Sequence, residues 1–355
     1  MISKVLALMV LTTAVSQAEI PEGYYDPAGG LTGQALQWAL HSIIDGHDPC
    51  SYNYIWTAFY TTDNRNGNKV WDMYSDIPGG TPPYLYTLGD DQGGSASAEG
   101  QGYNREHSWP KSWFGNGSPM NTDLFHIVPS DIYVNSRRGN HPYAEVSNPD
   151  WISMNGSRVG PSSTPGYSGT AFEPVDGYKG DFARSYFYMA TRYKGQDSGW
   201  PGSAMTNGAD LLPWAVDMLL EWHANDPVSD KEIERNEAVY AIQDNRNPFI
   251  DHPEYAVMIY DPESGVHSQE AEEAIQLFCS QNPFMDSVTI TASAGSSVVT
   301  VSVMDVTGRV LSSYGGTGPE VSFVWASTEP GLYLVVTESG PRSAVMPVVS
   351  LGSAR

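Results

Sequence analysis

A carboxylate and an imidazole stand side by side in the segment YNREHSWPKSWFG (103–115), where Glu106 directly precedes His107. If this segment forms a strand, the two side chains point to opposite faces, because successive residues of a strand alternate. One of them could then bind a cation while the other accepts a proton. Most Glu-His dipeptides are ordinary surface residues, so the pair alone does not identify an active site.

A second polar group follows in DLFHIVPSDIYVNSRRGNHPYAEV (123–146), where Asn135 comes after an apolar run and precedes Arg137 and Arg138. Amide and carboxylate oxygens are hard ligands that suit Mg²⁺, which keeps several waters and takes few protein ligands beside phosphate oxygens. Guanidinium groups match the geometry of phosphate. A base, two metal ligands and a phosphate clamp therefore fall within one short stretch of chain.

The surrounding chain predicts an α+β protein. Apolar residues at helical spacing predict four helices, with a stop at Gly46 for the first, Pro213 in the first turn of the third and a Ser229/Glu232 capping box for the fourth. After Asn282 the sequence alternates β-branched and polar residues between Gly and Pro, which predicts about seven short strands in a small antiparallel sandwich. The four helical segments are 31–47, 181–194, 209–225 and 229–244.

Several long segments, in order, resemble the bacterial endonuclease I family of extracellular nucleases, of the ββα-metal or His-Me finger type. Besides the two segments above they include YYDPAGGLTGQALQWALHSIIDGH, NGSRVG, FEPVDGYKGDFARSYFYMATRY and NRNPFIDHPEYA, so the resemblance covers about 19–260. It implies a mixed helical nuclease domain with an embedded ββα-metal finger. In this finger His107 is the general base, Glu106 and Asn135 are the metal ligands, and Arg138 contacts phosphate.

Two positions depart from the family pattern. Gly102 stands where relatives often have Cys, and Ser136 stands where they often have Gly. Loss of the cysteine removes a local bridge and leaves the catalytic atoms alone, whereas Ser136 can alter the turn that presents Asn135.

The resemblance implies sequence-independent cleavage of DNA, with RNA as an additional substrate and the preference between them open. His107 would take a proton from the attacking water while one Mg²⁺, with Mn²⁺ or Ca²⁺ as alternatives, neutralises the phosphate and the leaving 3′ oxygen, giving 5′-phosphate ends. A secreted carbohydrate-binding or glycoside-hydrolysing protein is the alternative. It would explain the aromatic residues and the sandwich, but a binding module does not need these four residues, and no segment singles out an acid/base pair for a glycosidase.

The chain divides into an expected signal peptide (1–18), the nuclease domain (19–282) and the sandwich (283–355). Lys4, an apolar run and small residues before a cut after Ala18 are typical of a secretory signal. The sandwich resembles the C-terminal sorting domain of type IX secretion, although its usual basic last strand is absent, and a generic β-sandwich is the other interpretation. Without a later membrane span, we expect a secreted monomer whose C-terminal domain contacts the secretion machinery.

Further polar residues have structural alternatives. In an exported chain Cys50 and Cys279 are compatible with one disulfide, and two free thiols are the alternative. We expect His126 to be a buried core histidine, while His141 contacts substrate or closes a loop. Two further segments, KGDFAR (179–184) and NRNPFIDHP (245–253), are expected to be a helix start and a rigid turn.

The overall charge argues against a basic nucleic-acid binder, because 41 Asp and Glu face 18 Lys and Arg for a formal net charge of −23. The excess is regional, however. Residues 99–195, which contain the candidate site, hold as many basic as acidic residues. The sequence therefore predicts weak electrostatic capture of nucleic acid and a strong dependence on a bound metal.

Overall fold

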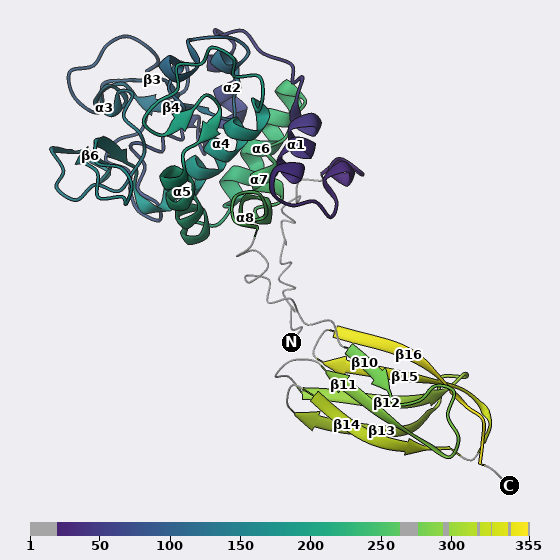
Figure 1. The fold of residues 1–355 in the computed structure, drawn as a ribbon. Coiled ribbons are helices and arrows are strands. Elements are labelled where there is room, and N and C mark those ends of the chain that lie inside the picture. The colour runs from purple at the N-terminus through teal and green to yellow at the C-terminus, as the bar shows by residue number, and fades with distance from the viewer. Residues whose placement is uncertain are drawn as a thin grey trace, which may run out of the picture. The chain divides into compact units, whose positions relative to one another are not determined.

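The computed structural model describes residues 20–262, 276–293, 298–317, 320–327, 329–339 and 342–353. The chain divides between Pro262 and Glu263 into two units, which we call the first and second units (Figure 1). The sequence places the boundary at residue 283, but strand β10 (Gln276–Cys279) pairs with β11 (Ser287–Ser293) and so belongs to the second unit. The expected signal peptide lies outside the described residues. Within the described part of the chain, no helix has the length and apolar character needed to cross a membrane.

The first unit contains the four predicted helices. α5 (Pro213–Asn225) begins at the predicted proline, and α6 (Asp230–Gln243) begins after a complete capping box between Ser229 and Glu232. The other two are α1 (Gly33–Ile44) and α4 (Lys179–Arg192). The remaining helices are α2 (Ile55–Thr62), α3 (Ile132–Arg138), α7 (Pro248–Asp251) and α8 (Glu254–Tyr260).

Helix α4 forms the centre of the first unit and is buried on all sides, with α1, α5 and α7 packed against it (Figure 1). A central helix normally carries apolar residues all round, yet α4 contains the fully buried Arg184. Its guanidinium is paired with both carboxylate oxygens of Glu232 on α6, which compensates for its loss of water. Glu232, the second member of the α6 capping box, therefore also fixes α6 to the core.

The strands of the first unit are short and all pair antiparallel. The pair that bears on function is β3 (Tyr103–His107) with β4 (Ile127–Asp131). The others are β1 (Asn64–Arg65) with β2 (Lys69–Val70), β5 (Trp151–Ile152) with β6 (Arg158–Pro161) and β7 (Thr170–Glu173), and β8 (Thr206–Asn207) with β9 (Asp210–Leu211). Short 3₁₀ turns η1 (Asp26–Ala28), η2 (Lys111–Phe114), η3 (Met120–Thr122) and η4 (Asp176–Tyr178) connect these elements.

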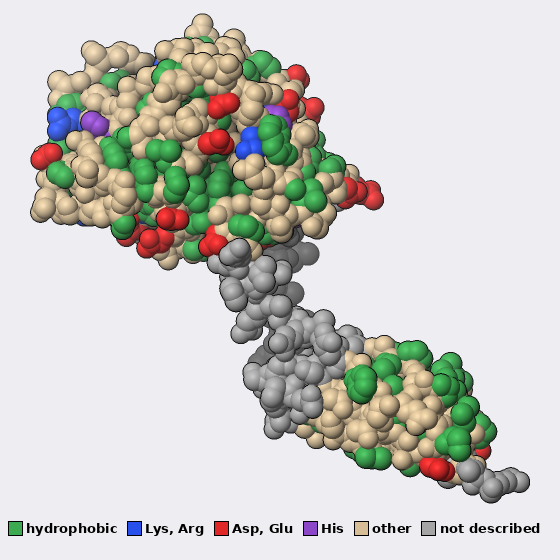
Figure 2. Space-filling view, in the orientation of Figure 1, with side chains coloured by type: hydrophobic (Ala, Val, Ile, Leu, Met, Phe, Trp, Pro, Cys, Tyr) green, Lys and Arg blue, Asp and Glu red, His purple; other side chains and the backbone are tan. Residues whose placement is uncertain are grey.

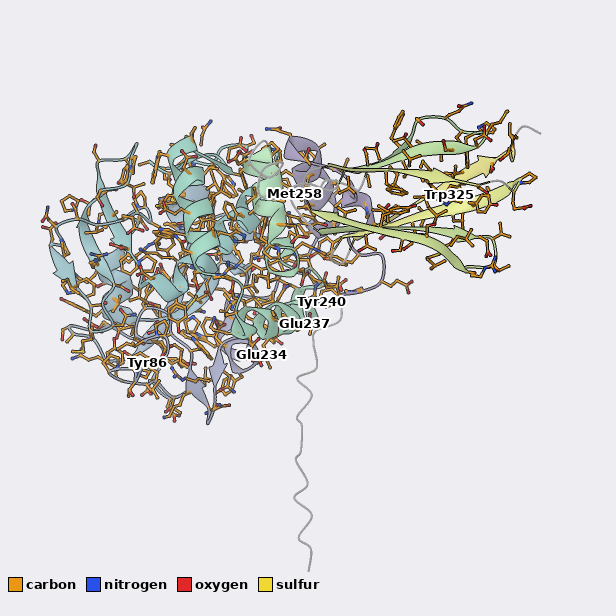
Figure 3. The ribbon with its side chains drawn as sticks, turned by 90° about the horizontal axis from the view of Figure 1, so that it is seen from below. Tyr86, Glu234, Glu237, Tyr240, Met258 and Trp325 are labelled. Atoms are coloured by element: carbon orange, nitrogen blue, oxygen red, sulfur yellow. The ribbon has the colours of Figure 1, made fainter. Side chains whose placement is uncertain are left out.

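The second unit is the predicted small β-sandwich. One sheet has the strand order β10-β11-β14 and the other β13-β12-β15-β16. Trp325 lies between them and contacts Phe284 and Tyr333, so it forms the centre of a core that is separate from that of the first unit (Figure 3). The remaining strands are β12 (Val298–Asp305), β13 (Val310–Thr317), β14 (Glu320–Ala326), β15 (Gly331–Ser339) and β16 (Arg342–Ser350).

The first unit has an acidic surface, and each unit contains one of the two cysteines. On the face of the first unit drawn in Figure 2, Asp and Glu side chains are more frequent than Lys and Arg, in line with the acidic composition. The two cysteines lie in different units, and both are free and half-buried. Each is a free thiol within its own unit, and a disulfide between Cys50 and Cys279 stays a prediction.

Candidate functional site

Strands β3 and β4 with helix α3 form a β-β-α arrangement that carries the residues singled out from the sequence. Glu106 lies opposite Val128 and His107 opposite Ile127 in the antiparallel register. Pro129 is tolerated in β4 because this strand pairs with β3 in a two-stranded sheet, which leaves its other edge free of ladder bonds. α3 follows β4 directly, so Asn135 and Arg138 are fixed relative to Glu106 and His107 by continuous secondary structure.

A buried carboxylate determines where α3 begins. Asp131 caps the helix through a 2.8 Å bond from the Val134 N–H to its Oδ1, and its Oδ2 accepts from the Tyr86 hydroxyl and from the Gly100 N–H at 2.9 Å. The Asp131 N–H in turn donates to Asp72 at 2.8 Å. Burial raises the pKa of Asp72 to about 7, while hydrogen bonds from its neighbours favour the carboxylate. These two acids were not among the residues singled out from the sequence.

The two departures from the family pattern have local explanations. Gly102 has φ +138°, and a Cβ there would lie 2.9 Å from the Asp91 carbonyl oxygen, so a side chain is disfavoured immediately before β3. Ser136 is exposed within α3, and its hydroxyl donates to the Tyr133 carbonyl at 2.8 Å. A helix, not a turn, therefore presents Asn135, and the expectation that Ser136 alters a turn is wrong.

One face of β3 carries an oxygen-rich group that we call the oxygen cluster: Asn104, Glu106 and Asn135. The Asn135 amide donates from Nδ2 to Asn104 Oδ1 at 2.8 Å, and Asn135 also lowers the pKa of Glu106. Asn104 and Glu106 are two residues apart on one strand, so both point to this face, while α3 brings Asn135 to it. Sequence reasoning found Glu106 and Asn135, and strand alternation was the signal that could have added Asn104.

Glu106 is a buried carboxylate, 4% exposed, and it is held from behind. Arg138 Nη1 lies 3.0 Å from its Oε1, and the Tyr74 hydroxyl donates to the same oxygen at 3.1 Å. Burial raises the pKa of Glu106 to about 7, against Arg138, Tyr74 and Asn135, which lower it. A divalent cation at this carboxylate would favour the ionised form further.

Arg138 has a position different from the one the resemblance implies. It is 1% exposed, and it donates to the backbone carbonyls of His107 at 3.2 Å and Ser108 at 2.5 Å besides pairing with Glu106. Its guanidinium also lies 4.8 Å from the ring centroid of Tyr143. In this geometry Arg138 faces the protein interior and supports Glu106 and the end of β3, while its contact with phosphate stays a prediction.

His107 points to the other face of β3. Its Nε2 lies 3.2 Å from the Asn121 carbonyl oxygen, which can only accept, so Nε2 carries the proton and Nδ1 keeps its lone pair. The ring is stacked on Tyr52 with centroids 6.1 Å apart. Burial lowers the pKa of His107 well below its usual value, and His126 and Lys111 act in the same direction. His107 is therefore neutral at pH 7, as a general base must be.

The other polar candidates have structural roles. His126 is fully buried and its Nε2 donates to the Met120 carbonyl at 2.7 Å. The backbone N–H of His141 closes the turn after α3 on the Arg138 carbonyl at 3.2 Å, and a substrate contact of its imidazole stays a prediction. The charged residues of segments 179–184 and 245–253 form buried or partly buried ion pairs. These are Lys179 with Glu145 and Glu173, Asp181 with Lys231, and Arg246 with Asp251.

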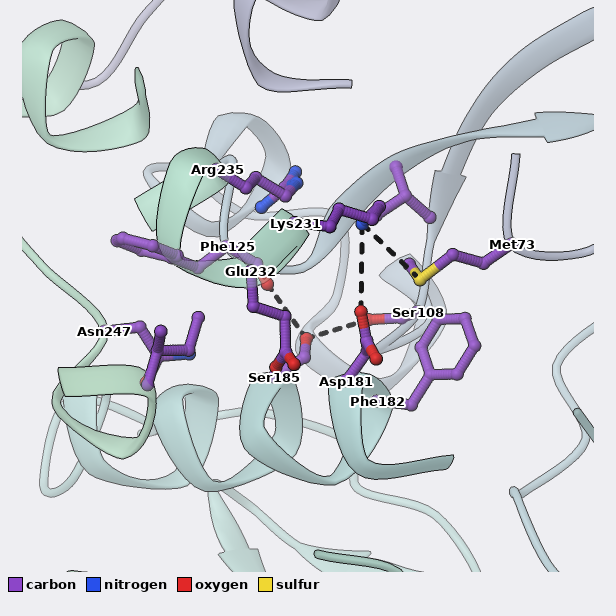
Figure 4. A pocket seen from close by; sticks show the side chains of 12 residues that line it. Met73, Ser108, Phe125, Asp181, Phe182, Ser185, Lys231, Glu232, Arg235 and Asn247 are labelled. Atoms are coloured by element: carbon purple, nitrogen blue, oxygen red, sulfur yellow. Dashed lines mark hydrogen bonds and ion pairs between the residues drawn. The ribbon is translucent and has the colours of Figure 1, made fainter. Parts of the chain in front are cut away.

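A small cavity of about 30 Å³ lies near β3, between α4 and α6 (Figure 4). It is lined by Ser108, Asp181 and Lys231 among others, with Lys231 Nζ 3.7 Å from Asp181 Oδ1. This volume suits one or two waters and is far too small for a nucleotide. The cavity is therefore part of the packing beneath the site and not a substrate pocket.

The oxygen cluster fits a hard divalent cation. Among the described residues, no group of three or more His, Cys, Asp or Glu could hold a metal ion. A cation at Glu106 would therefore have one carboxylate and water, and the amide oxygens of Asn104 and Asn135 would join them once the Asn135 amide rotates, because its Nδ2 donates to Asn104 Oδ1 in this structure. This donor set is all oxygen and suits Mg²⁺ better than a transition metal that prefers nitrogen or sulfur.

Comparisons with known proteins agree with the segments identified in the sequence. The family model of endonuclease I matches residues 32–254. The extracellular ribonuclease of Bacillus subtilis (strain 168) is 37% identical over 72% of this chain and 84% of its own length, and that of Bacillus amyloliquefaciens is 40% identical over 67% and 78%.

The second unit has weaker similarities. A structure of PorZ, a bacterial surface component of the type IX secretion system of Porphyromonas gingivalis, is 21% identical over 23% of this chain and 12% of that chain, with a TM-score of 0.20. A likeness of this size carries no argument about fold or role. For the first unit the evidence is direct: the chain belongs to the endonuclease I family and is a nuclease, that is, a phosphodiester hydrolase.

Proposed function

We propose that this protein is a secreted, metal-dependent and largely sequence-nonspecific endonuclease, active as a monomer on DNA and also on RNA. One observation carries the proposal: a neutral imidazole on one face of β3 and a hard-oxygen cluster on the other, held by a single strand. The name of the two Bacillus relatives, extracellular ribonuclease, supports export and RNA as a substrate. Family membership supports DNA.

His107 is the proposed general base. With its Nε2 proton donated to Asn121, the Nδ1 lone pair is available to take a proton from water as the water attacks phosphorus. Burial keeps the imidazole neutral, and Tyr52 restricts its rotation by stacking. Glu106, adjacent in sequence, faces away and does not compete for this proton.

Glu106 and Asn135, with Asn104 beside them, would hold Mg²⁺, for which Mn²⁺ or Ca²⁺ are alternatives. When bound, such a cation stabilises negative charge on the phosphate and on the leaving 3′ oxygen. Arg138 and Tyr74 hold Glu106 in one orientation, and the Asp131 cap holds the helix that carries Asn135. Departure of the 3′ oxygen leaves 5′-phosphate ends.

Export is proposed through the signal peptide at 1–18, and contact with a type IX secretion machinery through the second unit. Replacing the second unit by a sandwich of another class should retain the nuclease inside the cell envelope if this unit is the sorting signal. Unchanged release into the medium would contradict this part of the proposal.

The central test is His107→Ala in a plasmid-nicking assay with Mg²⁺, with and without EDTA. Loss of a general base reduces turnover by about 10²–10⁴-fold, with the fold unchanged. His252→Ala is the matched control, because His252 pairs with Glu254 at 3.1 Å and takes no part in the site. EDTA should abolish nicking by the wild type, and ligation of the products should report 5′-phosphates. Near wild-type turnover of His107→Ala would contradict the mechanism.

A further inference from the structure

Most cations of the first unit are already used in ion pairs. Ten of its described Lys and Arg side chains lie within 4.0 Å of a carboxylate oxygen. The other four described side chains form no ion pair: Lys69, Arg105, Lys111 and Arg137. Three of these four come from β3, η2 and α3, the elements around the candidate site. In a chain with a net charge of −23, acids for pairing are abundant, so the unpaired cations are not explained by a shortage of partners.

Two of the unpaired cations meet on the His107 face of β3. Arg105 and His107 are two residues apart on one strand and therefore point the same way. The Tyr52 ring packs on both of them, with the Arg105 guanidinium carbon 3.7 Å from its centroid. Lys111 Nζ lies 5.4 Å from the same centroid. Tyr52 thus joins both cations to the proposed base.

Arg105 is held rigidly but is not saturated. Its guanidinium also lies 4.4 Å from the Trp56 ring centroid, and Nη1 donates to the Tyr52 carbonyl at 2.7 Å. Its Nε is buried and has no hydrogen-bond partner among the described residues. A half-buried guanidinium fixed by two aromatic rings, without a carboxylate, is preorganised for an anion that arrives from outside.

We propose that Arg105 and Lys111, positioned by Tyr52, bind a backbone phosphate of the substrate next to the scissile phosphate, on the His107 side. This proposal rests on the proposed nuclease function. The neighbouring phosphate fits better than the scissile one, because both cations rest against the Tyr52 ring and Arg105 also rests against Trp56, whereas the scissile phosphate must lie at the His107 ring itself. The role is binding and strand positioning, and the chemical step belongs to the other residues.

The test measures binding of a fluorescein-labelled single-stranded DNA oligonucleotide in the His107→Ala background, as a function of salt. Each phosphate contact on a single strand contributes about 0.7 to the slope of log K against log salt concentration. Lys111→Gln and Arg105→Gln should each reduce the slope by about 0.7 and weaken binding by about fivefold at 0.1 M salt. Lys69→Gln is the matched control, because Lys69 is also unpaired but its Nζ bonds Thr87 on another part of the unit.

Unchanged slopes for both variants, or an equal reduction for Lys69→Gln, would overturn the proposal. If Arg105→Gln fails to fold, Lys111→Gln alone decides, since Lys111 is only partly buried in a short 3₁₀ turn. Steady-state cleavage by Lys111→Gln and Arg105→Gln, with His107 present, distinguishes contact with the neighbouring phosphate from contact with the scissile one. For the neighbouring phosphate, KM should rise several-fold while kcat stays nearly unchanged. A fall in kcat at constant KM would mean contact with the scissile phosphate and would also overturn it.

The proposed function and this inference fail separately. A wild type that binds the oligonucleotide but does not cleave it would contradict the proposed function, while the salt slopes would still test the phosphate subsite. A wild type that cleaves, with slopes that do not respond to either substitution, would contradict the subsite alone.

Discussion

Arg138 is where the structure and the family resemblance lead to different experimental expectations. If Arg138 contacts phosphate, its removal weakens substrate binding and leaves stability intact. If it supports Glu106 from the interior, its removal leaves a buried carboxylate without a charge partner. We therefore expect Arg138→Met, which keeps an unbranched apolar side chain but removes the guanidinium, to destabilise the first unit.

The magnitude follows from the contacts that are lost. Arg138 gives up its ion pair with Glu106 at 3.0 Å and its bonds to the carbonyls of His107 and Ser108 at 3.2 and 2.5 Å. Removing one partner of a buried ion pair costs about 3–5 kcal/mol, which already includes leaving the other charge uncompensated. We expect a loss of about 4 kcal/mol in the free energy of unfolding, within the upper tail for single substitutions.

Urea unfolding of the full-length protein, followed by tryptophan fluorescence, measures this loss. All tryptophans except Trp325 belong to the first unit, so the signal reports mainly on it. Arg137→Met is the matched control: Arg137 is exposed, and its replacement should change stability by less than about 0.5 kcal/mol.

A double-mutant cycle with Glu106→Gln makes the test specific to the ion pair. The double variant should be clearly more stable than the sum of the two single losses predicts, because each single change breaks the same interaction. If Arg138→Met is as stable as Arg137→Met and instead raises KM, the interior role of Arg138 is refuted and phosphate contact is restored.

Three further predictions concern the surroundings of the site. Asp131→Ala should cost at least about 1 kcal/mol in unfolding free energy through loss of the α3 cap, and should lower turnover because α3 carries Asn135. Asn104→Ala should raise the Mg²⁺ concentration for half-maximal nicking by about tenfold, because Asn135 loses its 2.8 Å partner; an unchanged Mg²⁺ titration would remove Asn104 from the oxygen cluster. Burial, aided by Arg184, lowers the pKa of His223 to about 4, so the unfolded chain binds one more proton than the folded one between about pH 6.5 and 4, and stability falls as the pH falls through this window. His223→Gln should therefore lose about 2 kcal/mol less than the wild type between pH 7 and pH 5 in urea unfolding, and equal losses would contradict this reasoning.

The sequence predicted those elements whose signals are local. The capping box before α6, the proline that opens α5 and the strand alternation of the sandwich depend on neighbours in the chain, and all three predictions are confirmed. The order of β3, β4 and α3 also followed from family segments. Each of these features is decided by residues a few positions apart.

Long-range contacts could not be predicted in the same way. Whether Arg138 faces solvent or Glu106 depends on Tyr143 and Tyr186, which come from distant parts of the chain and contact the guanidinium, and on Tyr74, which holds Glu106. Likewise Asp72 and Asp131 look like ordinary acids in the sequence, and only the fold brings one beneath the other. Periodicity and caps carry no information about such contacts.

The alternation of β3 explains why its residues occur in the order Asn-Arg-Glu-His. Asn104 and Glu106 fall on the face that meets Asn135, while Arg105 and His107 fall on the face that meets Tyr52. Exchanging Glu106 with His107 would place a carboxylate against the unpaired cation Arg105 and an imidazole beside Arg138. The carboxylate would neutralise the proposed phosphate subsite, and the imidazole would be a poorer ligand for a hard cation. With this sequence order, β3 keeps the residues for proton transfer and phosphate binding on one face and the residues for cation binding on the other. That separation lets an acidic protein act on a polyanion with few unpaired positive charges.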